Sequence, residues 1–457
     1  MGTDRPTRVR WKVMAFLCVL SFLTYYDRNC ITQVQGAIQA DLRLSDSQLS
    51  WVFWAFWFTY ALFEIPGGWL CDRFGPRVTL VRIVLAWSLF TALTGFATGF
   101  LSLIAFRLLF GMGEAGAYPS MARVQSSWLS AFSRARAGGL LWLTARWGAA
   151  FAPVIMGWII AVFDAASTRW LLSVVGLGEV SSWRFGFFVS GLFGLVWVVF
   201  FWRFFRDDPA TDVRVNAAEL AVIRSGGATA SGAKAHTDHS LRAIGQVFTS
   251  RSLWAIALLY LCGSFGWSFF VSWLPRYMND VHHVPFKQSG WSAAMPLLFA
   301  GVACLVGGLL SDGLVKWTGR RRLGRAILPM FGYLTAAAAM IGVTVTKTPE
   351  QATVLLCVAA FTYDLGQGAN WASIVDIGGK FAGIAAGFIN MVGNMSNAFQ
   401  PPLGRWIFAE YGWPTLFGVY AAAFCGAALM WLFIDPTKRF YTDEPEVRGF
   451  EVGPAKA

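Results

Sequence analysis

Apolar stretches of about 20 residues, long enough to cross the hydrocarbon of a bilayer, recur along nearly the whole sequence. Backbone polar groups cannot face lipid unpaired, so these stretches must form helices. Charged residues make up only 14% of the chain, whereas a soluble domain has about a quarter. We therefore predict an all-α membrane protein with no room for a soluble catalytic domain. Twelve transmembrane helices are expected near 13–37, 49–71, 78–98, 101–124, 137–163, 184–203, 253–278, 291–315, 325–346, 351–376, 381–409 and 412–434.

The formal net charge of +12 is spread unevenly over the predicted loops. Most Lys and Arg fall on the side shared by both termini, as in residues 5–12, 203–251 and 316–325. Lys and Arg are enriched in cytoplasmic loops, so we expect both termini in the cytoplasm and a multi-pass protein of the cell (inner) membrane. The excess of Lys and Arg then sets the orientation of the protein in the membrane, and no nucleic-acid partner is expected.

Cysteines and histidines are poorly placed for catalysis or metal binding. The seven cysteines are scattered with no pair at ligand spacing, and the four histidines fall in predicted loops. No Gly-rich stretch has the spacing of a phosphate-binding loop. We predict no enzyme activity, no metal site and no cofactor.

The least hydrophobic stretch of the chain separates two sets of six predicted helices. It contains Gly, Ser and His in a composition typical of a flexible linker. We expect an N-terminal six-helix bundle in residues 1–205, a cytoplasmic central loop in 206–250, a C-terminal six-helix bundle in 251–435 and a cytoplasmic tail in 436–457.

A short pattern, Gly-x-Leu-x-Asp, occurs after the second predicted helix and again after the eighth. Repetition at equivalent places indicates two related halves. Glycine permits close helix approach, and an aspartate at a helix end can cap a neighbouring helix or pair with an arginine. We therefore expect a gating latch that makes and breaks, formed by Gly68, Asp72, Arg73 and Arg77 in the first half and by Asp312 in the second.

The first copy of this pattern, Gly68-Trp-Leu-Cys-Asp-Arg-Phe-Gly-Pro-Arg77, resembles the loop signature of the major facilitator superfamily. Other stretches resemble its anion:cation symporter family, which includes bacterial hexuronate, glucarate and galactonate transporters and animal sialic-acid carriers. These stretches are Tyr25-Tyr-Asp-Arg28, Tyr60-Ala-Leu-Phe-Glu-Ile-Pro66, Arg107-Leu-Leu-Phe-Gly-Met-Gly-Glu114, Arg206-Asp-Asp-Pro209, Trp273-Leu-Pro275 and Asn390-Met-Val-Gly-Asn394. The resemblance covers roughly residues 12–435 and implies two bundles that alternate access to a site at the membrane midplane.

Several ionisable side chains lie inside the predicted helices, where a charge costs about 2.5–3.5 kcal/mol and needs a partner. The most telling are Asp27, Arg28, Arg107, Glu114 and Arg146. Adjacent helical residues diverge by about 100°, and residues seven apart lie about 10 Å apart along the axis, so pairing must run between helices. Asp27 with Arg107, and Glu114 with Arg28, is the simplest neutralising arrangement. The alternative is a static cluster that holds two helices in register.

The guanidinium of Arg28 is a planar two-pronged donor suited to a carboxylate. A substrate anion that competes for an arginine makes the displaced carboxylate easier to protonate. The family resemblance implies these roles too: Asp27 and Glu114 match proton sites, and Arg28 matches the substrate arginine. With Arg107, the two acids form the predicted proton-coupling set.

Hydroxyl and amide groups around this arginine would suit a polyhydroxylated acid. The resemblance places Tyr25, Tyr60 and Asn390 in the sugar-acid site, and Ser373 is a plausible further contact. The alternatives are an interfacial tyrosine belt and amides that bond between helices.

Arg146 departs from the resembling galactonate carriers, which have an uncharged glutamine near this position. A second central arginine indicates either a substrate with two acidic groups, such as an aldarate or dicarboxylate, or a partner for Glu114. In the seventh predicted helix, only Arg276 is present, at the outer end. This argues against a sugar-phosphate exchanger, whose family pattern places an arginine inside that helix.

We predict a secondary active transporter that carries a small organic anion, a sugar acid such as a hexuronate, aldonate or aldarate, in symport with protons. The main alternative is a facilitator or exchanger of the same fold, sodium- or phosphate-linked. A structural or receptor role is the remaining one. The expected partners are the organic anion, protons and the lipid bilayer, and we expect a monomer.

Overall fold

The computed structural model describes residues 5–174, 176–225, 244–284 and 290–441, and the regular structure in this part of the chain is helical. Helix occupies all twelve predicted ranges, with ends shifted by a few residues. Nine of the described helical runs are long and apolar enough to cross a membrane. The last of them, 349–430, is broken at Gly379 and Gly412, whose φ values of 49° and 83° interrupt the helical path. The predicted all-α membrane fold is confirmed.

Some predicted transmembrane helices consist of two helical pieces. In the first half the helices are α1 (Val9–Leu42), α2 (Asp46–Phe74), α3 (Pro76–Thr94), α4 (Phe100–Glu114) with α5 (Ala117–Trp128), α6 (Arg134–Asp164) and α8 (Ser182–Phe204). In the second half they are α11 (Arg251–Ser268), a π-helical turn (Phe269–Trp273) and α12 (Leu274–His282), then α13 (Gly290–Thr318), α14 (Arg321–Val343), α15 (Pro349–Leu365) with α16 (Gln367–Gly378), and α17 (Ala382–Met430). The pieces α4–α5, α11–α12 and α15–α16 each correspond to one predicted transmembrane helix.

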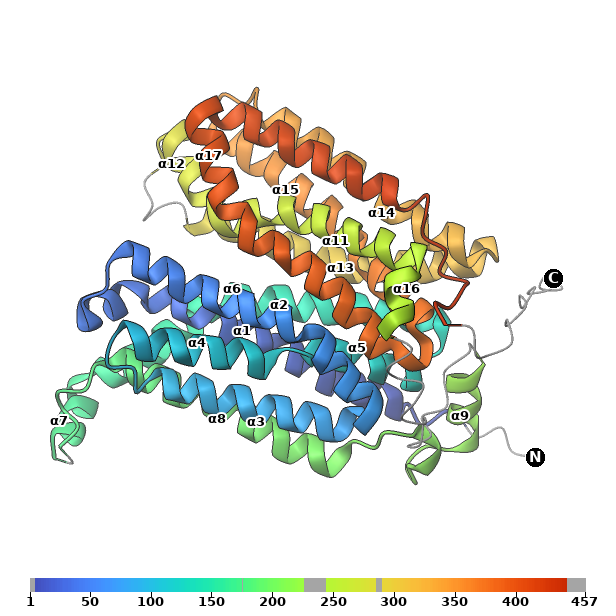
Figure 1. Ribbon diagram of the computed structural model, residues 1–457, viewed down its shortest axis with the longest axis horizontal. Helices are drawn as coiled ribbons and strands as arrows, with labels where there is room; N and C mark the ends of the chain where they lie inside the picture. The colour runs from blue at the N-terminus through green and yellow to red at the C-terminus, as the bar shows by residue number, and fades with distance from the viewer. Residues whose placement is uncertain (1–4, 175, 226–243, 285–289, 442–457) are drawn as a thin grey trace.

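The two halves form two bundles whose helices run roughly along one common direction (Figure 1). Across the interface α6 packs on α13 and α2 packs on α17. The short helix α7 (Ala166–Val174) lies at one end of the molecule, and the loop helix α9 (Ala217–Arg224) lies at the other (Figure 1). We call these ends the α7 side and the α9 side.

Large apolar side chains remain exposed on the outside of both bundles. Examples are Leu101, Val154 and Trp158 in the first bundle and Phe331 and Leu334 in the second. A soluble protein rarely exposes so much contiguous apolar surface. These side chains are suited to contact with lipid tails, which fits a multi-pass membrane protein.

On the α9 side the bundles meet through glycines of the repeated pattern. An added Cβ at Gly68 would collide with the carbonyl oxygen of Gly383, and one at Gly308 would collide with the carbonyl oxygen of Ala135. Both contacts join α2 or α13 to a helix of the opposite bundle. The absence of a side chain therefore lets the two backbones touch.

The two aspartates of the repeat cap helices of the opposite bundle. The Asp72 carboxylate accepts hydrogen bonds from the amides of Gly383 (3.2 Å) and Ile384 (2.8 Å), at the start of α17. The Asp312 carboxylate accepts from the amides of Ala135 (3.3 Å) and Arg136 (2.9 Å), at the start of α6. The partial positive charge of a helix N-terminus favours a carboxylate at each place.

Arginines complete both contacts. Arg325 donates to Asp312 at 2.7 Å, and Arg123 lies 3.6 Å from Asp72. A further buried pair, Arg134 with Asp376 at 2.5 Å, also joins the two bundles on this side. The α9 side is therefore sealed by ion pairs, hydrogen bonds and close backbone contacts, none of which is covalent.

Arg73 and Arg77, the other two residues of the predicted latch, contact the first half. The guanidinium of Arg73 lies over the Trp69 ring at 5.1 Å. The amide of Arg77 donates to Asp207 at 2.8 Å, and its guanidinium lies 4.2 Å from the Trp202 ring centroid. The gating role of the repeated loops remains a prediction.

The predicted central loop begins with a docked helix. Glu219 in α9 accepts hydrogen bonds from the amides of Val9 (2.9 Å) and Arg10 (3.0 Å), and thus caps α1. Asn216 caps α9 itself through the amide of Glu219. Residues 226–243 of the loop, and 442–457 of the predicted tail, lie outside the described residues.

Replacement of Asp312 by Asn removes the charge that holds two backbone amides and Arg325. Hydrogen bonds to charged groups contribute about 1.5–3 kcal/mol each, so we expect opening of the α9 side to become about tenfold more frequent. Electron spin resonance distances between labels at the exposed Phe74 and Trp317 would measure this opening.

Asp280→Asn is the matched control, because it neutralises the Asp280 carboxylate in an exposed pair with Arg276 away from the α9 side. An Asp312→Asn protein with the same distance distribution as this control would show that the carboxylate does not latch the bundles.

Candidate functional site

A cavity of about 1620 Å³ lies between the two bundles. Exposed Trp51, Trp54 and Trp406 line it near the α7-side ends of α2 and of the first limb of α17. Deeper in, its wall contains the buried side chains of Arg28 and Tyr60. Since the bundles are sealed on the α9 side, the cavity opens toward the α7 side.

Arg28 is the central cation of this wall. Its Nε donates to Oε1 of Glu114 at 2.7 Å, whereas its buried Nη2 has no hydrogen-bond partner among the described residues. The guanidinium carbon lies 4.2 Å from the ring centroid of Tyr60 and 5.1 Å from that of Tyr25. These rings stabilise the positive charge without using its donors. A buried, unused guanidinium nitrogen in a cavity is suited to an anion.

Glu114 is placed by a break between α4 and α5. The helix ends at this residue because Ala115 is extended (ψ 140°) and Gly116 has φ 87°. Gly116 also touches the backbone of Gly67, which leaves no room for a Cβ. A negative charge at a helix C-terminus is unfavourable unless a cation neutralises it. The predicted pair with Arg28 is therefore present, and Oε2 of Glu114 has no hydrogen-bond partner in the described structure.

The other predicted pair, Asp27 with Arg107, is wrong for this conformation. No ion pair joins these two described side chains, and both Oδ1 of Asp27 and Nε of Arg107 lack a hydrogen-bond partner there. Arg107 instead lies over the rings of Phe110 (4.9 Å) and Phe56 (5.2 Å) and lines the cavity. Its cation is thus stabilised by aromatic faces, and it acts on buried Asp27 only through space.

The predicted polar contacts are divided between the cavity and its surroundings. Tyr25, Tyr60 and Asn390 line the cavity, as do Gln367 and Asn394. Ser373 is not part of the wall. It is fully buried and its hydroxyl donates to the carbonyl oxygen of Ala369, one turn earlier in α16, at 2.9 Å. Its side chain is therefore satisfied within its own helix and turned away from the solute space.

Arg146 lines the same cavity but binds an acid of the other bundle. Its Nε and Nη2 donate to the two carboxylate oxygens of Asp364, at 2.8 and 3.0 Å. Its guanidinium carbon lies 3.6 Å from the ring centroid of Trp267. The interpretation of Arg146 as a partner for Glu114 is therefore wrong, because a two-pronged pair with Asp364 already neutralises it.

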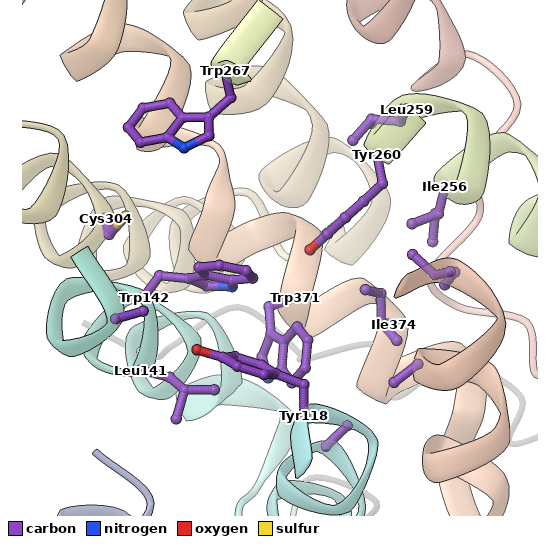
Figure 2. Close-up of a cluster of buried hydrophobic side chains, with 14 of the residues drawn as sticks. Tyr118, Leu141, Trp142, Ile256, Leu259, Tyr260, Trp267, Cys304, Trp371 and Ile374 are labelled. Carbon is purple, nitrogen blue, oxygen red and sulfur yellow. The ribbon is translucent and has the colours of Figure 1, made fainter. Parts of the chain in front are cut away.

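Aromatic side chains close the inner part of the cavity. Tyr118 and Trp142 are stacked at 5.3 Å, and Trp371 meets both rings edge-on (Figure 2). Trp267 and Tyr260 of the second bundle line the same cavity as Tyr118 and Trp142 of the first (Figure 2). The indole nitrogen of fully buried Trp371 donates to Gln125 at 3.0 Å. Fully buried Trp371 therefore packs against Tyr118 and Trp142 without being part of the cavity wall.

Three buried acids of the interface, Asp364, Glu64 and Asp376, are not among the predicted site residues. Asp364 lies inside the tenth predicted helix, and the only signal for it in the sequence is an acidic residue in an apolar run. The structure shows Glu64 and Asp376 fully or nearly buried, and the two oxygens of Glu64 lack a hydrogen-bond partner among the described residues.

The lining side chains offer ion pairing, hydrogen bonding and proton exchange. In the described part of the chain, no three His, Cys, Asp or Glu side chains are grouped so as to hold a metal ion. His282 lies near the α7 side, where its Nε2 is 3.1 Å from the Tyr277 hydroxyl.

Comparison with known proteins agrees with this arrangement. A family model for the Major Facilitator Superfamily matches residues 17–401. The probable sulfoacetate transporter SauU of Cupriavidus necator is 31% identical over 97% of this chain and 98% of its own length. The probable galactarate/D-glucarate transporter GudP of Bacillus subtilis is 28% identical over 97% of this chain and 95% of its own.

Among solved structures, the transporter FucP in the outward conformation superposes with a TM-score of 0.69 at 15% identity, covering 93% of this chain and 99% of FucP. At this identity the likeness concerns the fold alone. The named relatives are transporters, so this protein is a membrane transporter and not an enzyme. The chain belongs to the major facilitator superfamily and, as its motifs implied, to the anion:cation symporter family within it.

Proposed function

We propose that this protein is a proton-coupled symporter for a small organic anion, and that the anion is a sugar acid such as a hexuronate, aldonate or aldarate. One observation carries the proposal. The buried Arg28 side chain lines a cavity between the bundles, its Nε holds Glu114, and its Nη2 has no hydrogen-bond partner among the described residues.

Competition for this guanidinium couples the anion to a proton. A substrate carboxylate that binds Nη2 of Arg28 weakens the hold on Glu114. A buried carboxylate that loses its cation takes up a proton more readily, because an unpaired charge in a low-dielectric site is costly. The anion and the proton thus enter together without adding net charge.

Asp27 is the second proposed proton site. It is almost fully buried on α1, next to Arg28, and one of its carboxylate oxygens has no hydrogen-bond partner among the described residues. Arg107 is the cation that acts on it through space. Movement of α4 relative to α1 would change this interaction, so protonation and helix movement are linked.

The relatives support an acidic solute, and the cavity lining supports one that also carries hydroxyl groups. Sulfoacetate, galactarate and D-glucarate, the compounds in the names of SauU and GudP, are organic anions. Tyr25, Tyr60 and Asn390 supply hydroxyl and amide groups next to Arg28. Such groups favour a solute that hydrogen-bonds to them over one that cannot, since a solute without hydroxyl groups would leave them buried and unpaired.

We place the protein in the cell membrane with the α9 side and both termini in the cytoplasm. Lys12, Arg203 and Arg322 lie on that side, in keeping with the enrichment of basic residues in cytoplasmic segments. The described conformation would then be open to the outside. A monomer suffices, because one chain supplies the cavity wall and the sealing contacts of both bundles.

Uptake of D-glucarate and D-galactonate into proteoliposomes tests the coupling. We expect accumulation only when the interior is alkaline relative to the exterior. Equal uptake with and without the pH gradient would identify a facilitator instead, and dependence on sodium or phosphate would identify the corresponding symporter or exchanger.

Replacing Arg28 by Lys keeps the charge but removes the planar fork. We expect the affinity for the transported acid to fall about 10- to 100-fold, since charged hydrogen bonds contribute about 1.5–3 kcal/mol. Titration calorimetry on the purified protein would measure the change. Arg184→Lys is the control, because Arg184 pairs with Asp41 outside the cavity. Similar losses in both variants would argue against a substrate role for Arg28.

Replacing Asp27 by Asn removes a proton site and keeps the side-chain shape. We expect gradient-driven uptake to be abolished while counterflow exchange of solute is spared, because exchange needs no net proton movement. Both assays use the same proteoliposomes. Loss of both activities to the same degree would point to a folding role for Asp27.

A further inference from the structure

The ion pair between Arg146 and Asp364 differs from the sealing contacts in its position. It joins α6 of the first bundle to α15 of the second, at the level of the cavity. Asp364 is fully buried and Arg146 is 5% exposed, yet Arg146 forms part of the cavity wall. The pair is therefore a bond between the bundles that a solute can reach from the guanidinium side.

Two guanidinium groups flank one aromatic pair in this cavity. The Tyr25 ring centroid lies 5.1 Å from the Arg28 guanidinium and 6.3 Å from the ring centroid of Trp142. Trp142 in turn lies 5.4 Å from the guanidinium of Arg146. All four side chains line the same cavity. A solute lying across these rings can place one acidic group at each arginine.

We propose that Arg146 and Asp364 form a second exchangeable ion pair, and that the substrate is accordingly a diacid. Its first acidic group binds Arg28, and its second displaces Asp364 from Arg146. The inference rests on the proposed function, because it assigns the second half of the same anion site.

Charge balance then sets the number of protons. Before binding, each arginine is neutralised by a protein carboxylate, Glu114 or Asp364. After binding, each arginine is neutralised by an acidic group of the substrate. Each displaced carboxylate takes up a proton that comes from the outside solution as hydronium, because leaving it ionised and unpaired would cost about 3–5 kcal/mol. Displacement of these carboxylates therefore takes up two protons with a diacid and one with a monoacid, in addition to the proton that Asp27 carries with either acid.

The surroundings of Asp364 favour this exchange. Among the described side chains that act on it, Arg146 of α6 is the only cation. The other titratable groups near it are neutral hydroxyls and a thiol: Cys304 of α13, Tyr25 of α1, Tyr333 of α14 and its neighbour Tyr363. Once Arg146 turns to a substrate, nothing in this set replaces its positive charge.

The exchange also releases a bond between the bundles. While Arg146 holds Asp364 with two hydrogen bonds, α6 and α15 cannot separate without exposing a charge at the centre of the protein. A diacid with its protons neutralises both groups. The second acidic group thus removes a barrier to rocking that a monoacid leaves in place.

Proton counting on the purified protein tests the proposal. D-glucarate and D-gluconate are six-carbon acids that differ only in one terminal carboxylate. Calorimetric titration with each, in buffers of different ionisation enthalpy, gives the number of protons taken up on binding. We expect one more proton with D-glucarate than with D-gluconate in the unmodified protein.

Variants assign the extra proton to its site. Asp364→Asn should take up one proton fewer with D-glucarate and the same number with D-gluconate. Asp41→Asn, which neutralises a carboxylate paired with Arg184 outside the cavity, should behave as the unmodified protein. Arg146→Lys should lower the affinity ratio of D-glucarate to D-gluconate about tenfold, because the fork that matches a second carboxylate is lost.

Each outcome has a distinct meaning. Equal proton uptake with the two acids in the unmodified protein would overturn the proposal, and this comparison does not depend on a variant that folds. An extra proton that persists in Asp364→Asn would overturn the assignment to Asp364. The ion pair of Arg146 and Asp364 would then be a permanent contact between the bundles. Binding of D-gluconate alone would overturn the diacid while sparing the proposed function. No binding of either acid would overturn the proposed function itself.

Discussion

Arg28 of α1 and Glu114 at the end of α4 form a buried ion pair. The rest of the site depends on keeping both of these charges neutralised. Removing one partner of such a pair costs about 3–5 kcal/mol, because the other charge is then unpaired in a low-dielectric environment. Any event that separates Arg28 from Glu114 must supply a substitute anion for one and a proton for the other. The break after Glu114, the aromatic rings around Arg28 and the cavity beside it make this substitution feasible.

The contacts between the bundles are of two kinds, which differ in whether they reach the cavity. On the α9 side, glycines let the backbones touch, the Asp72 and Asp312 side chains accept from backbone amides of the opposite bundle, and Arg134 pairs with Asp376. These contacts involve no atom of the cavity wall. At the level of the cavity, the link is between side chains, Arg146 and Asp364, and one of them faces the solute space. The first kind depends on the relative position of the bundles, whereas the second also depends on what the cavity holds.

Much of this architecture could be predicted from the sequence. The length of the apolar stretches predicted where the helices lie, and the repeated Gly-x-Leu-x-Asp pattern singled out Asp72 and Asp312. Local composition and spacing carry that information. The bond between Arg28 and Glu114 followed from the need to neutralise buried charges. Partners across the two bundles could not be predicted, since the rotation of α6 and α15 about their axes is set by packing. Asp364 was missed for this reason, and Ser373 turned out to be satisfied within α16.

The docking of α9 has a consequence for the connection between the bundles. Because Glu219 holds the first amides of α1, the segment up to Arg224 is fastened to the first bundle. The connection between the two bundles therefore begins at Arg224 and not at the end of α8. A deletion between α8 and α9 would thus strain the anchor of α1 within the first bundle and leave the length of chain between the bundles unchanged.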